Sequence, residues 1–256
     1  MSVVRAMLIT ALLAGFVSAR GVSAAPFASA RNLVVVRCSD SVNGVAERVY
    51  LDEFDVSGEA PTLVQAISLE STGPDAITLS NGTDHDRHLH RSADGRFLVF
   101  AAYNAPYDDN PNDLPPMARS AASTPRTIVL VKSDGSLDTT TRLIDTCDYS
   151  AIRGAVTTDG NQIWIGGDNA SGATLSGGTR YTVRGSSTTV NLSQVQSFGG
   201  SHTPDNVRDV GVFGNQLYNS SGSSSSIGKS VFQVGVGLPT SGSQPLTRLI
   251  AETAST

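Results

Sequence analysis

The chain has 256 residues, of which 39% are hydrophobic and only 16% are charged, and it contains 25 glycines. This composition is poor for helices and typical of an all-β protein with many turns. The formal net charge of −5 excludes the basic surface that nucleic-acid-binding proteins present to phosphates.

The first residues predict a secretory signal peptide over residues 1–24. Arg5 is the only charge before an apolar run from 6 to 17, and residues 22–24 fit a cleavage site. Cleavage after Ala19 is the alternative. The run is too short for a membrane span, and no later segment is apolar for long enough to cross a bilayer. We therefore expect a secreted or extracellular protein.

Three stretches repeat a short strand, a tight turn and a second strand, at residues 88–104, 151–169 and 206–222. The turns contain residue pairs that tolerate the positive φ of two-residue hairpins. These pairs are Asp94-Gly95, Asp159-Gly160 and Gly214-Asn215. Each stretch therefore predicts a β-hairpin.

A second pair of strands follows each hairpin, at residues 126–145, 177–193 and 229–251. Residues 32–70 carry the same pattern without its first strand. The second strands begin near residues 33, 98, 162 and 215, a spacing of about 53 to 65 residues. Four strands per unit at a period near 50 residues predict an all-β, β-propeller-like array. We expect this repeat domain to span residues 32–256.

Several segments carry a resemblance that covers most of residues 32–250: "RVYLDEFDVSGEAPTLVQAISLE", "RSADGRFLVFAAYN", "IRGAVTTDGNQIWIGG" and "VFGNQLYNSSG". They look like parts of uncharacterised secreted β-propeller-like repeat proteins, whose chains are longer. The resemblance implies a fold and carries over no catalytic residue. The chain holds about three and three-quarter units, so we expect an incomplete array of about four units. A compact four-bladed form and a β-sandwich built from the same hairpins are the alternatives.

The connections divide the array into a plain face and an elaborated face. Because strands alternate in direction, the short turns gather on one face and the long loops on the other. The long loops are residues 39–47, 71–86, 104–126, 168–177, 195–206 and 219–229. Long loops on a rigid scaffold are where binding usually resides, although drift of unconstrained loops would look the same.

Cys38 and Cys147 both fall on the elaborated face, and in an oxidising compartment they predict one disulfide. Two buried free thiols are the alternative. Four sequons predict glycosylation if the host glycosylates, at Asn81, Asn169, Asn191 and Asn219.

Three of the four histidines lie between residues 85 and 90. His88 and His90 share one side of an inner strand, and His85, Asp86 or the remote His202 could supply a third metal ligand. No recognised metal motif matches, so we predict no metal or cofactor and regard the histidines as solvated. Three histidine or carboxylate side chains converging on one point would reverse that prediction.

Arg153 and Arg208 also lie on inner strands, where they are weak candidates for binding an anion and better explained as structural ion pairs. The segment 108–113 resembles the start of a calcium loop but departs from an EF-hand at Asp113 and Arg119. No nucleophile elbow or phosphate-binding loop is present.

We therefore expect a non-enzymatic extracellular binding or scaffold module. Its partner would be an extracellular protein or glycan. The alternatives are a propeller hydrolase or lyase that uses a metal or histidine site, and a structural component of a cell envelope or matrix.

Overall fold

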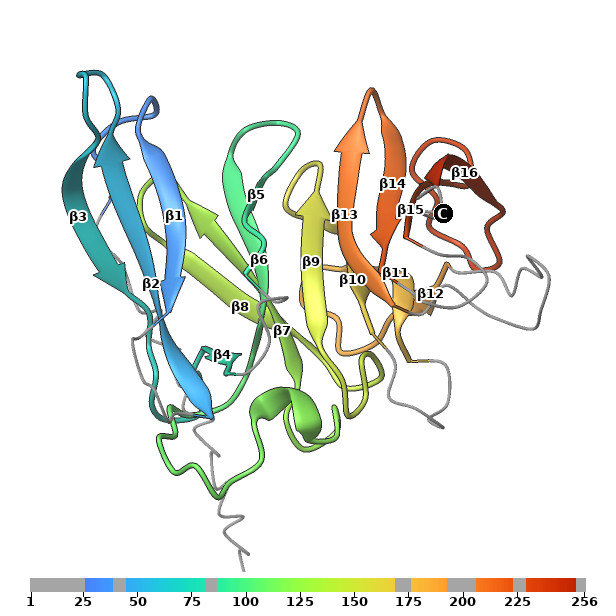
Figure 1. Cartoon of the computed structure of the whole chain (residues 1–256), viewed down its shortest axis with the longest axis horizontal. Coiled ribbons are helices and arrows are strands. Elements are labelled where there is room, and N and C mark those ends of the chain that lie inside the picture. Colours follow the sequence, from blue (N-terminus) through green and yellow to red (C-terminus); the bar gives the residue numbers. More distant parts are fainter. Residues whose placement is uncertain are drawn as a thin grey trace, which may run out of the picture.

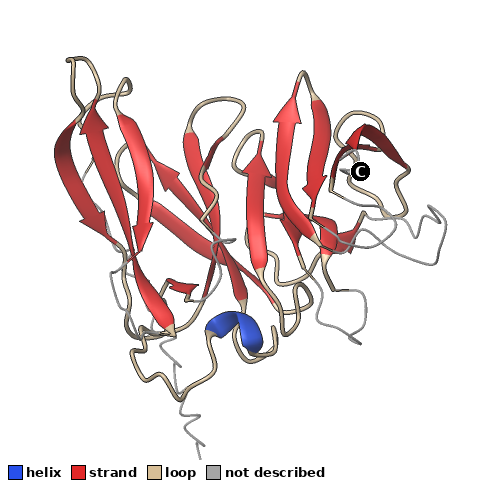
Figure 2. Cartoon of the chain, viewed as in Figure 1, coloured by secondary structure: helices blue, strands red, loops and turns tan. Residues whose placement is uncertain are grey.

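The computed structural model describes residues 26–38, 45–81, 87–168, 176–192, 206–222 and 229–251. The predicted signal peptide lies outside these residues. In the described part, strands make up nearly all of the regular structure, and the 3₁₀ turn η1 (Pro116–Ala118) is the only helical element (Figure 2). No helix of this part is long and apolar enough to cross a lipid bilayer.

The strands follow the predicted units in chain order. The first unit consists of β1 (Leu33–Cys38), β2 (Ala46–Asp55) and β3 (Thr62–Ser68). The second consists of β5 (His90–Arg91), β6 (Phe97–Tyr103), β7 (Arg126–Lys132) and β8 (Leu137–Leu143). The third consists of β9 (Ile152–Thr157), β10 (Gln162–Gly167), β11 (Gly178–Val183) and β12 (Val190–Asn191). The fourth consists of β13 (Val207–Phe213), β14 (Gln216–Ser221), β15 (Ser230–Val234) and β16 (Leu246–Ala251).

Every pairing between these strands is antiparallel. The third and fourth units are separate four-stranded sheets, in the order β12-β11-β10-β9 and β13-β14-β15-β16. The first and second units are joined, because the short strand β4 (Thr78–Ser80) pairs with both β2 and β6. The four-stranded pattern is confirmed for the last three units, and the first unit has three strands of its own.

The predicted hairpin turns have the backbone that their residues favour. Gly95 and Gly160 have φ of 74° and 78°, and Gly214 and Asn215 have φ of 56° and 60°. Glycine and asparagine adopt this left-handed region at little cost. The Gly-Asn pair therefore closes β13 onto β14 with only two residues between the strands.

The units stand side by side, from β1–β3 to β13–β16 (Figure 1). One apolar core lies between each pair of neighbours. Alternate residues of β6 supply two of these cores: Val99 and Ala101 face the third unit, whereas Phe100 and Ala102 face the first. The third core, between the last two units, contains Trp164. No strand pairing among the described residues links the first unit to the fourth, so no closed ring is seen.

The two cysteines correct the disulfide prediction, because both are buried free thiols. Cys38 lies in the core between the first and second units, whereas Cys147 lies in the core between the second and third. The sheet formed by β6 and β7 separates these cores, so the two sulfur atoms cannot meet without unfolding it.

A buried guanidinium fixes the longest described loop to the link between the second and third units. Arg126 is fully buried at the start of β7, where it lies over the Tyr103 ring at 5.3 Å. Burial lowers its pKa. Its Nη atoms donate to five backbone carbonyls, at distances of 2.7 to 3.1 Å: Thr124, Met117, Arg119, Cys147 and Ser150.

The first unit has its own buried charge, Glu53 on β2. Its carboxylate accepts hydrogen bonds from the backbone N–H groups of Ala28 and Ser29 and from the side chains of Asn32 and Gln65. Burial alone would raise the pKa of Glu53, but these donors outweigh it and lower the pKa. The carboxylate thus holds residues 26–32 against the first sheet.

Much of the expected elaborated face lies outside the described residues, including the sequon Asn169. Asn219 falls within β14 instead of a loop, and its buried side chain donates to Thr179 Oγ1 at 2.7 Å. That contact argues against a glycan at Asn219 in the folded protein. Asn81 and Asn191 are half-buried.

Candidate functional site

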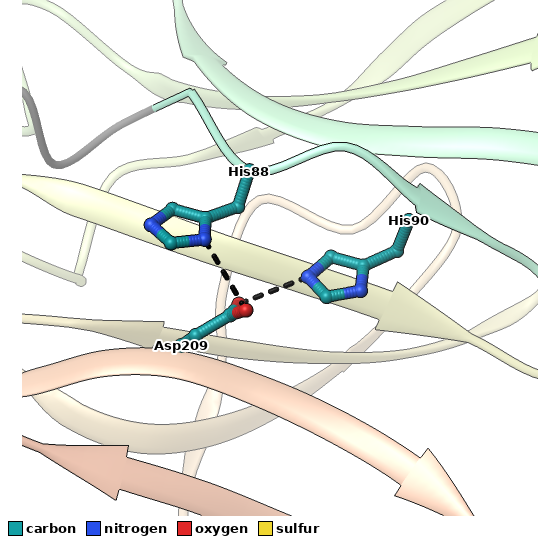
Figure 3. Close-up of side chains that lie close together, drawn as sticks. All are labelled: His88, His90 and Asp209. Atoms are coloured by element: carbon teal, nitrogen blue, oxygen red, sulfur yellow. Dashed lines mark hydrogen bonds and ion pairs between the residues drawn. The ribbon is translucent and has the colours of Figure 1, made fainter. Parts of the chain in front are cut away.

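Two predicted histidines meet a carboxylate that sequence reasoning missed. His90 lies on β5, His88 lies just before it, and Asp209 lies on β13, 119 residues after His90. His90 Nε2 is 2.9 Å from Asp209 Oδ1, and His88 Nδ1 is 3.2 Å from Asp209 Oδ2. The two imidazoles point toward the same carboxyl group (Figure 3). The second and fourth units are thus bridged by three side chains.

Gly154 on β9 makes this bridge possible. A Cβ at that position would lie 2.2 Å from Asp209 Oδ1 and 3.1 Å from the backbone nitrogen of Val210. Any side chain there would therefore displace the carboxylate or push β13 away. The third unit lies between the two halves of the site, and the absence of a side chain at Gly154 leaves room for the carboxylate.

Irregular pairing on β13 explains why this neighbour was hard to foresee. The partners on β14 pass from Val207 directly to Asp209, so Arg208 has no partner of its own. On β9, the partners likewise pass from Ile152 to Gly154 and skip Arg153. Each skipped residue is a β-bulge, and a bulge changes which side chains share a face. Strict alternation fails there, so counting along the sequence could not orient Asp209.

The site is partly desolvated and favours ionised Asp209. The exposed fractions of its side chains are 36% for His88, 26% for His90 and 29% for Asp209. Burial would by itself raise the pKa of Asp209, but hydrogen bonds and charge from the two histidines lower it well below its usual value. The backbone N–H of Val210 also donates to Oδ1, at 2.9 Å.

The donor atoms have the spacing of a metal site. One ligand atom from each of the three residues lies within 4.8 Å of the other two. Zinc binds nitrogen and oxygen at roughly 2.0–2.1 Å, so neighbouring ligands of a tetrahedral ion are about 3.3 Å apart. The two nitrogen–oxygen distances between the histidines and Asp209, 2.9 and 3.2 Å, lie close to that value. The histidines were expected to be solvated, whereas His88 and His90 both contact Asp209 and are partly buried.

A small hollow opens directly beside these donors. It has a volume of about 180 Å³ and is lined by His90 and Asp209 together with Phe213, Tyr218 and Val231 of the fourth unit. The rings of Phe213 and Tyr218 are 6.2 Å apart, and Phe213 is 71% exposed. A molecule that binds at the donors would therefore contact an apolar wall.

The candidate arginines lie elsewhere on the inner strands. Arg153 is buried, forms an ion pair with Asp168 at 3.0 Å and donates to Asn206 and to the carbonyl of Val207. Burial, together with Arg153, lowers the pKa of Arg208. The hydrogen bonds of Arg153 to Asn206 and Val207 tie the third unit to the fourth, and its ion pair with Asp168 is of the structural kind expected from the sequence.

The remaining candidates add no ligand set. In the calcium-like loop, Asn110 and Asn112 form hydrogen bonds with Asp108, with each other and with Asp113, as side chains of polar turns do. Asp108 raises the pKa of Asp113. His85, Asp86 and His202 lie outside the described residues.

No protein-family model matches the chain, and searches of curated proteins and of solved structures find no match.

Proposed function

We propose that the chain is a secreted binding module of propeller-like β-units that holds a divalent transition-metal ion at His88, His90 and Asp209. The observation that carries this proposal is the convergence of these side chains from two units, within 4.8 Å.

The donor set selects the metal. Calcium and magnesium prefer six or more oxygen ligands, whereas imidazole and carboxylate together suit zinc and its first-row neighbours. Three protein ligands with an open fourth position are typical of accessible zinc sites. We therefore commit to Zn²⁺ as the preferred ion.

The propeller arrangement and the extracellular location belong to the same proposal. Support for the arrangement comes from the unit-by-unit packing, in which β9 of the third unit contacts β5 and β6 of the second and β13 of the fourth. Support for the location comes from the signal-peptide pattern of residues 1–24. The resemblance to secreted propeller-like repeat proteins points the same way.

The proposal is tested by calorimetric titration of the purified mature chain with zinc chloride at pH 7.5. We expect one site per chain, and zinc at a hundredfold excess over its Kd should stabilise the fold by about 2.7 kcal/mol. Asp209→Asn keeps the shape and should weaken binding at least tenfold. Asp75→Asn is the matched control, because Asp75 is 57% exposed in a surface ion pair. Equal zinc affinity in wild type and Asp209→Asn would refute the site.

A metal-dependent hydrolase is the second candidate, and the hollow beside the donors favours it. An ion with an open position lowers the pKa of a bound water, and the wall of Phe213 and Tyr218 would hold an apolar substrate group. The zinc-loaded wild type and zinc-loaded Asp75→Asn should then hydrolyse p-nitrophenyl acetate at equal rates. Both should be at least tenfold faster than Asp209→Asn. Equal rates in all three proteins would eliminate the enzyme and leave the binding module.

A further inference from the structure

A groove of about 320 Å³ separates the first unit from the second at their inner edges. The first unit contributes Leu33 and Val34 at the start of β1 and several residues of the segment 27–32 before it. The second contributes Leu89, Leu98 and other residues in and around β5, β6 and β7. His90 also lines the groove, at the end nearest the candidate metal site. β1 pairs with β2 along one edge, and no described strand pairs with its other edge.

The other three units show what normally occupies that edge. β6, β10 and β14 are the equivalents of β1, and each pairs antiparallel with an inner strand: β5, β9 and β13 respectively. The inner strands also lie beside one another, because β9 contacts β5 on one side and β13 on the other. The groove lies on the remaining side of β5, where the next inner strand of this series would lie.

The groove also has a defined chemistry. Its floor includes the apolar side chains of Leu89, Leu98 and Val131, which suit the alternate side chains of a strand. Its rim carries cations on the second unit, namely Arg91, Arg96 and Lys132, all exposed. The chain as a whole has a net charge of −5, so a cationic rim is a local feature that favours an acidic partner.

We infer that this groove binds an extended acidic segment of another protein, which adds to β1 as an antiparallel strand. Main-chain hydrogen bonds to the edge of β1 would supply affinity, as in other cases of strand addition. Apolar side chains at alternate positions would enter the groove, and carboxylates at the positions between them would reach the cationic rim. The segment would complete the first unit as β5, β9 and β13 complete the others.

The probe is a fluorescein-labelled heptapeptide of alternating valine and glutamate, followed by fluorescence anisotropy in EDTA so that the metal site plays no part. We expect saturable binding of this peptide and at least tenfold weaker binding of the same peptide with lysine in place of glutamate. A version with proline at alternate positions has too few N–H donors to pair and should not bind.

Variants of the chain locate the binding. Lys132→Glu reverses an exposed charge on the rim and should weaken the glutamate peptide at least fivefold, with an unchanged melting temperature. Lys229→Glu, an exposed lysine of the fourth unit, is the matched control and should leave binding unchanged. Absence of binding, or equal binding by the two variants, would overturn the inference. A dimer by light scattering that excludes the peptide would also overturn it, because a second copy would then be the occupant.

Discussion

The first unit and the three units after it use the same strands but differ in their inner edge. In the second to fourth units, an inner strand pairs with the hairpin partner and carries polar groups: His90 on β5, Arg153 on β9 and Asp209 on β13. The first unit has no such strand among the described residues, and a groove lies beside the start of β1. The inner strands of the second to fourth units thus bring polar side chains together between units: Asp209 meets His90, and Arg153 contacts Asn206 and Val207.

The largest expected effect on stability comes from removing Arg126, a buried cation that joins the second and third units. The comparison is with Arg37, a more exposed cation in the first unit. Arg126→Met removes five hydrogen bonds to carbonyls inside the fold, and we expect a loss of about 3–5 kcal/mol in unfolding free energy. Arg37→Met removes an ion pair with Asp52 in which Arg37 is 43% exposed and Asp52 is 9% exposed, and should cost less, about 1–2 kcal/mol. Urea denaturation measures both, and similar losses would break the distinction.

Gly154→Ala probes the space between the third and fourth units. Because its Cβ would lie 2.2 Å from Asp209 Oδ1, we expect about 1–3 kcal/mol of destabilisation and at least a tenfold loss of zinc affinity. Gly58→Ala in the first unit has only one atom within 4 Å, at 3.9 Å, and should change neither quantity. Wild-type zinc affinity in Gly154→Ala would show that the carboxylate does not depend on this space.

The pH dependence of the first unit should depend on Glu53. Its pKa is lowered in the folded chain, so its contribution is present above the ordinary value of 4.5 and is lost as the pH falls below it. At pH 7, Glu53→Gln should cost about 1.5–3 kcal/mol, since hydrogen bonds to a charged acceptor are lost. The difference between wild type and variant should shrink below pH 4.5 in urea titrations. A constant difference from pH 7 to pH 3 would show that the charge is not responsible.

The smallest expected effect is that of a reductant. Since Cys38 and Cys147 lie on opposite sides of the β6–β7 sheet, dithiothreitol should leave the melting temperature unchanged. Mass spectrometry of the denatured, alkylated chain should find both thiols modified without prior reduction. A loss of stability on reduction would show that Cys38 and Cys147 form a disulfide, which would contradict their separation by the β6–β7 sheet.

Most of the fold follows from local patterns in the sequence. The continuous apolar run from 97 to 103 is typical of a strand buried on both faces, and the Gly-containing pairs predict the turns, because both depend on residues within a few positions. The link made by β4 was not foreseen, since three residues are too few to show a period. Cys147 lies in the link between the second and third units, whereas Cys38 is the last residue of β1, and neither position along the chain reveals which core the side chain enters.

The sequence by itself determined most of the strands, the turns, the four-unit spacing and the position of His90 on an inner strand, with His88 just before it. Only the tertiary structure decided what those histidines meet. Asp209 reaches them because β9 carries a glycine at 154 and β13 bulges at Arg208, and both matter only once three sheets stand side by side. The physical reason is range: backbone preferences act between neighbouring residues, whereas a contact across 119 residues depends on how whole units stack.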